Sequence, residues 1–169
     1  MFLSGTTRVL SDAQPDAAGG RSVGFLTLAF HTYCKPSVTK TWTCGRYVGY
    51  SPSLQTVIVA HRGADASKIE ALATDANIIR RRFDSTLFPG ISSDVGIHDS
   101  FGSEQEKTAT QVLVAVQSAV SAHGAKQVTI VGHSLGVAIS LIDSVYLPLH
   151  DSGVSFKTVL YGMPRLRLP

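Results

Sequence analysis

Cysteine is scarce in this 169-residue chain, which contains Cys34 and Cys44 and no others. There is no Cys-x-x-Cys pair and no cluster of Cys and His at ligand spacing, so we expect no metal site and no other cofactor. The two thiols could form a local disulfide or stay free. Long apolar runs are also missing, and no transmembrane segment is expected.

Charged residues are few, at 16% of the chain against 44% hydrophobic residues, which is typical of a globular domain. Lys and Arg exceed Asp and Glu by enough to give a net charge of +3. The basic run Arg80-Arg81-Arg82 is not interleaved with aromatic residues, so no nucleic-acid partner is expected. We interpret this run as the solvated face of a helix.

Residues 1–21 lack the features of a signal peptide. Arg8 and Arg21 do not lead into a long apolar region followed by a small-residue cleavage site. This predicts either an intracellular protein or a true start that lies further upstream. We interpret 1–21 as a disordered leader and 22–169 as a single domain, because no repeat or composition shift divides the rest.

Segments rich in β-branched residues alternate with segments of helical periodicity. This alternation predicts an α/β fold with a mostly parallel sheet flanked by helices. Pro148 is expected to stop the last helix, and 85–96 to form a loop. The predicted strands are 46–50, 56–61, 127–131 and 156–161, and the predicted helices are 67–82, 104–123 and 136–147.

The segment 128–136 (VTIVGHSLG) carries the strongest functional signal in the chain. It is a Gly-x-Ser-x-Gly motif with a strand predicted before it and a helix after it, the context of a nucleophile elbow. The plainer interpretation is a strand–turn–helix joint with an incidental serine. The motif residues are Gly132, His133, Ser134, Leu135 and Gly136.

The spacing of this motif has a steric reason. A sharp turn holds the Ser134 hydroxyl clear of the backbone, and glycines at 132 and 136 let strand and helix pass closely because they have no Cβ. The turn also places the N-terminus of the helix beneath a developing negative charge. The backbone N–H of Leu135 is the expected first donor of an oxyanion hole.

Four ordered segments together resemble the fungal class 3 lipases, which are α/β-hydrolases that act on acylglycerols and have feruloyl esterases as relatives. The resemblance covers about 47–165. It implies a partial α/β-hydrolase fold that lacks the C-terminal strands, hence an incomplete lipase-like domain. The four segments are 57–63 (VIVAHRG), 97–101 (IHDSF), 131–136 (VGHSLG) and 158–165 (TVLYGMPR).

The resemblance also assigns roles to residues. Ser134 matches the nucleophile, Leu135 the first oxyanion donor and Ala64 the second, where the family usually has Ser or Thr. Residues 65–73 resemble the family's lid, with an ordinary amphipathic helix as the alternative. Val137 and Ser100 stand where the family usually has Gly.

The chain lacks a matching acid and base. In this fold the order is Ser, then Asp or Glu, then His. After Ser134 the candidates are Asp143, on the elbow helix itself, Asp151, and His150, after that helix. None is placed as in the family, so the family's Asp and His are not expected in this chain. His61 ends a strand near the expected oxyanion loop.

The resemblance implies a serine carboxylic-ester hydrolase of the triacylglycerol lipase type, active in lipid catabolism. Its substrate would be an acylglycerol or other ester at a lipid–water interface, its state monomeric and its location extracellular. The alternative is a catalytically inactive remnant or lipid-binding module. A serine peptidase or thioesterase on the same fold is a third possibility, which the other three segments disfavour.

Overall fold

The computed structural model describes residues 46–63 and 79–162. Within these, four strands form one sheet in the order β1-β2-β5-β6, and β3 and β4 form a second, two-stranded sheet. β1 pairs antiparallel with β2, while β2, β5 and β6 run parallel. The strands of the larger sheet are β1 (Arg46–Ser51), β2 (Thr56–His61), β5 (Gln127–His133) and β6 (Ser155–Tyr161).

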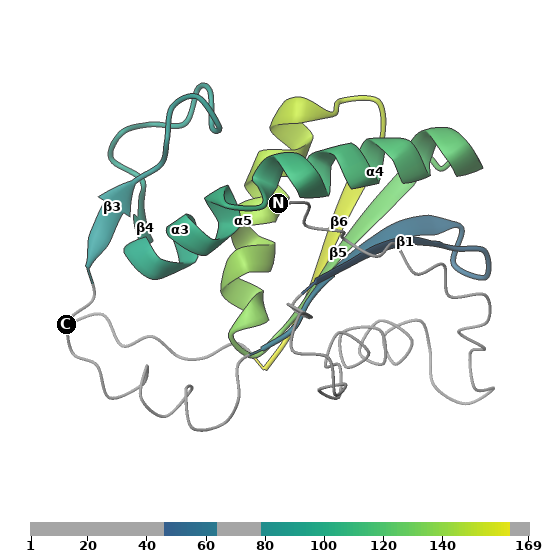
Figure 1. Ribbon diagram of the computed structural model, residues 1–169, viewed down its shortest axis with the longest axis horizontal. Coiled ribbons are helices and arrows are strands. Elements are labelled where there is room, and N and C mark those ends of the chain that lie inside the picture. Colours follow the sequence, from purple (N-terminus) through teal and green to yellow (C-terminus); the bar gives the residue numbers. More distant parts are fainter. Residues whose placement is uncertain (1–45, 64–78, 163–169) are drawn as a thin grey trace, which may run out of the picture.

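Helices cover one face of this sheet, and all three described helices lie on that side (Figure 1). α4 packs on β1 and β2, and α5 packs on β2, β5 and β6. The helices are α3 (Asp99–Glu106), α4 (Ala109–His123) and α5 (Gly136–His150). The α/β fold with a mostly parallel sheet flanked by helices is therefore as predicted.

The main core lies between the sheet and these helices. Side chains alternate along a strand, so Val57 and Val59 face the helices while Ile58 and Ala60 face the other side of the sheet. Every residue of β2 is buried, as expected for a strand that lies between two neighbours in a mostly parallel sheet. Buried members of the main core are Val48, Val57, Val59, Val128, Ile130, Val112, Val116, Ile142, Tyr146 and Leu147.

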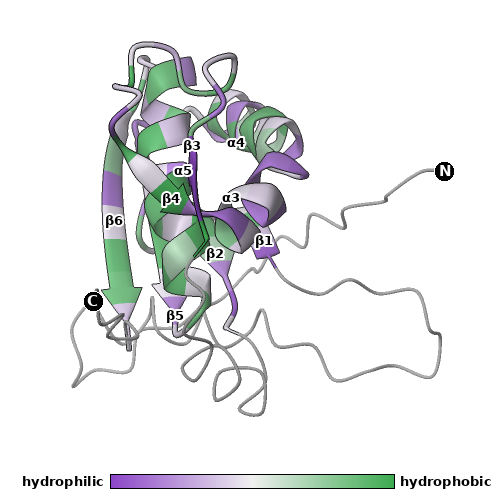
Figure 2. Ribbon diagram, turned by 90° about the vertical axis from the view of Figure 1, so that its left-hand side faces the viewer, coloured by the Kyte–Doolittle hydropathy of each residue, from purple (hydrophilic) through white to green (hydrophobic). Residues whose placement is uncertain are grey.

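The interpretation of the arginine run is wrong. Arg80–Arg82 form strand β3, which pairs antiparallel with β4 (Gly96–His98). Figure 2 shows this strand as strongly hydrophilic. Arg81 turns inward and forms ion pairs with Asp99 at 3.4 Å and Glu106 at 2.5 Å. The end of the predicted helix 67–82 is therefore replaced by the pairing of β3 with β4, which lies further along the chain. The earlier part of that predicted helix lies outside the described residues.

The predicted helix 104–123 is two helices. The chain leaves helical geometry at Thr108, where φ is −133°, so α3 ends at Glu106 and α4 begins at Ala109. Gly124 has a φ of 59° and ends α4 in the left-handed conformation that favours glycine.

Pro148 does not stop α5, which continues to His150. A proline inside a helix removes one backbone hydrogen bond to the residue four positions earlier. The buried side chains of Tyr146 and Leu147 hold this last turn on the core and offset that loss.

Several sequence-based expectations fall outside the described residues. These are the leader 1–21, the pairing of Cys34 with Cys44, the oxyanion residue Ala64 and the lid 65–73. In the part of the chain that the structure describes, no helix is long and apolar enough to span a bilayer. The same residues contain no group of Cys, His, Asp and Glu that could hold a metal ion.

The core makes a direct prediction on α5. Leu147 is 0% exposed and Leu141 is 43% exposed. Leu147→Ala should lower the free energy of unfolding by about 3 kcal/mol, because it leaves a cavity in the core. Leu141→Ala should change it by less than about 0.5 kcal/mol. Urea unfolding followed by circular dichroism measures both, and equal losses would contradict this description of the core.

Candidate active site

Ser134 lies on the tight turn between β5 and α5. Its φ is 52°, in the left-handed region that non-glycine residues seldom adopt. The turn is fixed on both sides, because the Ser134 N–H donates to the carbonyl of Tyr161 at 2.9 Å and the N–H of Val137 donates to the Ser134 carbonyl at 3.0 Å. The sharp turn that the motif predicts is therefore present, and Ser134 holds it in a strained backbone conformation.

The two motif glycines lie where backbones pass closely. A Cβ on Gly132 would be 2.6 Å from the Ser140 Oγ and 2.8 Å from the Val137 Cα. A Cβ on Gly136 would overlap the carbonyl oxygens of His61 and Arg62. The end of β2, the end of β5 and the start of α5 therefore meet at one point, and neither glycine has room for a side chain.

The N-terminus of α5 lies directly after Ser134 in the chain. Leu135, with φ −62° and ψ −28°, caps the helix that begins at Gly136. The first N–H groups of a helix lack partners inside it and carry a partial positive charge. An anion forming on a substrate at Ser134 would face this end of the helix. Arg62 and Gly63 continue from β2 toward Ala64, which lies outside the described residues.

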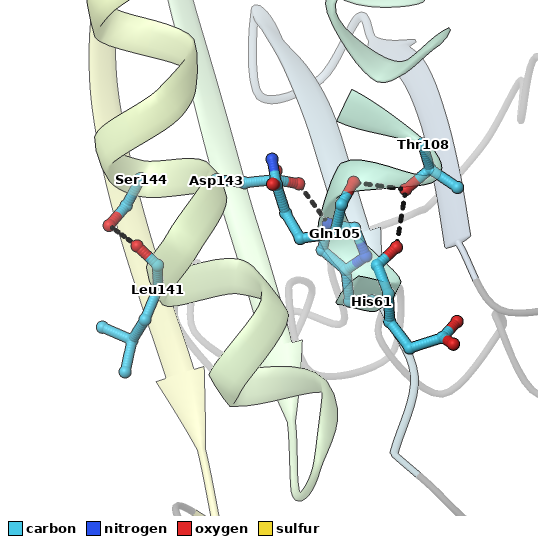
Figure 3. A network of polar contacts seen from close by, with 7 residues as sticks. His61, Gln105, Thr108, Leu141, Asp143 and Ser144 are labelled. Atoms are coloured by element: carbon cyan, nitrogen blue, oxygen red, sulfur yellow. Dashed lines mark hydrogen bonds and ion pairs between the residues drawn. The ribbon is translucent and has the colours of Figure 1, made fainter. Parts of the chain in front are cut away.

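A buried His–Asp pair beneath this turn was missed by the sequence reasoning (Figure 3). His61 Nε2 lies 2.7 Å from Asp143 Oδ2, and both side chains are 2% exposed. Gln105 Nε2 donates to the other carboxylate oxygen at 2.9 Å. The carboxylate oxygens accept, so His61 Nε2 carries the proton.

A signal for this pair exists in the sequence. His61 continues the alternation of Val57 and Val59 and therefore points to the helix-covered face of the sheet. Asp143 lies about two turns after Gly136, on the same face of α5. A polar residue on each of two facing apolar surfaces predicts that the two pair.

The other histidines have packing roles in the described structure. His150 lies in the last turn of α5, not after the helix, and its Nε2 donates to the Leu87 carbonyl at 2.7 Å. His98 packs on Phe101 with ring centroids 4.8 Å apart, and His123 stacks on Tyr50 at 4.4 Å. His133 is partly buried in the motif itself.

Burial raises the pKa of Tyr161 further above physiological pH, where a tyrosine phenol is already neutral. Tyr161 pairs with His133 in the parallel register, so this neutral phenol belongs to the strand next to the turn. The sheet edge beside Ser134 therefore carries no phenolate charge.

The family of this chain is evident from its similarity to known proteins. The model of the class 3 lipases matches residues 58–167, which is more than half of the chain. The chain belongs to the class 3 lipase family. A secreted mono- and diacylglycerol lipase from Malassezia globosa is 27% identical over 120 residues, which are 71% of this chain and 39% of that lipase.

Solved lipases share the fold of this class 3 lipase chain. The native Rhizomucor miehei lipase–propeptide complex matches with a TM-score of 0.66 at 19% identity, over 85% of this chain and 52% of that one. A triacylglycerol lipase from Penicillium expansum matches with a TM-score of 0.58 at 24% identity, over 67% and 43% respectively. The α/β-hydrolase fold is thus confirmed, and the described sheet corresponds to part of the fold of these longer proteins.

The close contact at Gly136 makes a testable prediction. Gly136→Ala should lower the free energy of unfolding by about 2 kcal/mol, although alanine favours helix, because its methyl group would meet two backbone carbonyls. Gly153→Ala is the control, because a Cβ there lies at an ordinary 3.4 Å from the Asp151 carboxylate. Thermal denaturation compares the two, and a stabilised Gly136→Ala would refute the close approach.

Proposed function

We propose that this chain carries the nucleophile of a serine carboxylic-ester hydrolase of the class 3 lipase type. The observation that supports this most is the positive φ of Ser134 on a turn between a buried parallel strand and a helix. Strain of this kind persists where the surrounding structure enforces it, and it clusters at active sites. Family membership gives the same reaction class.

The proposed chemistry begins with attack of the Ser134 Oγ on the carbonyl carbon of the ester. The carbonyl oxygen becomes an oxyanion, for which the N–H of Leu135, the N–H of Ala64 and the helix terminus are the proposed partners. The bond to the alcohol then breaks and leaves an acyl-enzyme, which water hydrolyses.

A general base must take the Ser134 proton. We propose that this base and its carboxylate are supplied from outside the described residues. His61 is buried and bonded to Asp143, and His150 is bonded to Leu87 at the far end of α5. Both imidazoles are thereby engaged away from the turn.

The proposed substrate is an acylglycerol or similar ester at a lipid–water interface, and the proposed location is extracellular. The Malassezia globosa relative, named as a secreted mono- and diacylglycerol lipase, supports both. A monomer acting without a cofactor fits the proposed serine chemistry, which needs neither a metal nor a partner chain.

The first test replaces the proposed nucleophile. In the full-length protein, Ser134→Ala should lower kcat for p-nitrophenyl butyrate by at least about 10³-fold, because no acyl-enzyme can form. Ser144→Ala is the matched control on the same helix, since the Ser144 hydroxyl bonds only locally to the Leu141 carbonyl at 2.7 Å. Unchanged hydrolysis by Ser134→Ala would refute the proposed nucleophile.

The second test concerns Ala64, where related lipases usually have a hydroxyl. Ala64→Ser should raise kcat about fivefold, the value of one added hydrogen bond of about 1 kcal/mol to the oxyanion. Ala122→Ser, at an exposed position of α4, should leave kcat unchanged. Steady-state kinetics measure both, and equal effects at the two positions would argue against an oxyanion role for Ala64.

A lipid-binding module without catalysis is the second candidate. The engagement of His61 and His150 elsewhere in the structure supports it. It predicts that the protein floats with triolein emulsion droplets on centrifugation while p-nitrophenyl butyrate is not hydrolysed. Hydrolysis that disappears in Ser134→Ala would eliminate this candidate.

A further inference from the structure

The buried network of His61, Asp143 and Gln105 joins three elements beneath the serine turn (Figure 3). His61 is the last residue of β2, Gln105 lies on α3 and Asp143 lies on α5. All three side chains are almost fully buried, with residue exposures of 1–2%. The proposed reaction does not use this network.

The end of β2 touches α5 at two separate places. Its backbone carbonyls at His61 and Arg62 pack against Gly136 in the first turn. The His61 imidazole bonds to Asp143 about two turns later, roughly 10 Å along the axis at about 1.5 Å per residue. Two contacts this far apart fix both the position and the direction of the strand end relative to the helix.

Stability alone does not account for such a network. Removing charged groups from water costs about as much as their attraction returns, so a hydrophobic substitute of equal volume is often neutral or better. Arg46 pairs with His61 across β1 and β2. Burial lowers the pKa of Arg46, and the coulombic influence of Asp143 and Glu104 opposes this shift.

The network fixes the orientation of the end of β2 relative to α5. Each of its hydrogen bonds has a fixed donor, acceptor and angle, whereas apolar contacts tolerate sliding. The constrained strand end leads through Arg62 and Gly63 to Ala64, the proposed second oxyanion donor. The helix at the other end of the network begins beside Ser134 and Leu135.

We propose that His61, Asp143 and Gln105 are positioning residues. They hold the end of strand β2 at a fixed place relative to the turn that carries Ser134. The proposal rests on the proposed function. In this proposal none of the three touches the substrate, and their effect on the reaction passes through the end of β2 and the backbone of Arg62 and Gly63 that follows it. An oxyanion forms only in the transition state, so a displaced donor lowers kcat and leaves KM nearly unchanged.

The test exploits the polarity of the network. Asp143→Asn replaces one acceptor oxygen by an NH₂ group, which then faces a donor on either His61 or Gln105. In the full-length protein this variant should lower kcat for p-nitrophenyl butyrate about tenfold to a hundredfold, with KM within about twofold. Gln105→Glu alone should also lower kcat, because two carboxylates then face each other.

The double variant Asp143→Asn with Gln105→Glu provides the rescue. The introduced amide accepts from His61 and donates to the introduced carboxylate, so each donor again faces an acceptor. Its kcat should return to within about threefold of the wild type. If each single variant lowered kcat only by destabilising the protein, the two losses would add in the double variant and kcat would not recover.

Thr56→Val is the matched control at the opposite end of β2. Thr56 Oγ1 lies 3.1 Å from Thr129 Oγ1, and both residues are fully buried, so this substitution also breaks a buried polar contact between β2 and another element. It should lower Tm with kcat unchanged. If Asp143→Asn likewise lowers Tm and leaves kcat unchanged, the positioning role is wrong.

Hydrogen exchange separates this proposal from the proposed function. In Asp143→Asn the amides of 62–63 should exchange at least about tenfold faster than in the wild type, with 57–59 unchanged, and the double variant should reverse this. Protection that stays unchanged overturns the positioning role whether or not esters are hydrolysed. Faster exchange together with activity that persists in Ser134→Ala would instead support the positioning of the strand while refuting the reaction.

Discussion

The close contact between the start of α5 and the end of β2 is the constraint on which the rest of the structure depends. A glycine at 136 allows the helix to touch the His61 and Arg62 carbonyls, and a glycine at 132 allows it to lie against β5. With these approaches fixed, the two residues before the helix must turn sharply. Ser134 takes up that turn at a positive φ. The strain at the serine thus follows from packing around two glycines.

The sheet and its covering helices give this turn a rigid base. β5 lies between β2 and β6, and in this parallel arrangement the C-terminal ends of the three strands meet at one edge, where His61, Gly132 and Leu160 lie in register. The carboxyl end of a parallel sheet is where α/β proteins place their sites. Asp143 and Gln105 then bring polar bonds into a mostly apolar layer beneath that edge.

Local sequence predicted the parts of the fold that local chemistry decides. The β-branched runs gave strands at 56–61 and 156–161 within a residue or two, and the motif gave a strand, a turn and a helix around Ser134. The features that the sequence did not predict depend on contacts between residues far apart in the chain. The arginine run forms a strand because it pairs with β4. Asp143 bonds to His61, which lies 82 residues earlier in the chain. The chemical role of Ser134 follows from the motif and the family and stays a prediction.

Covalent labelling with mapping of the adduct tests the central claim most directly. The full-length protein is treated with a p-nitrophenyl alkylphosphonate, digested and examined by mass spectrometry. Ser134, as the proposed nucleophile, should take up one phosphonyl group, with release of one equivalent of nitrophenol and loss of ester hydrolysis. An adduct on another residue, or hydrolysis that survives complete modification of Ser134, would contradict the account.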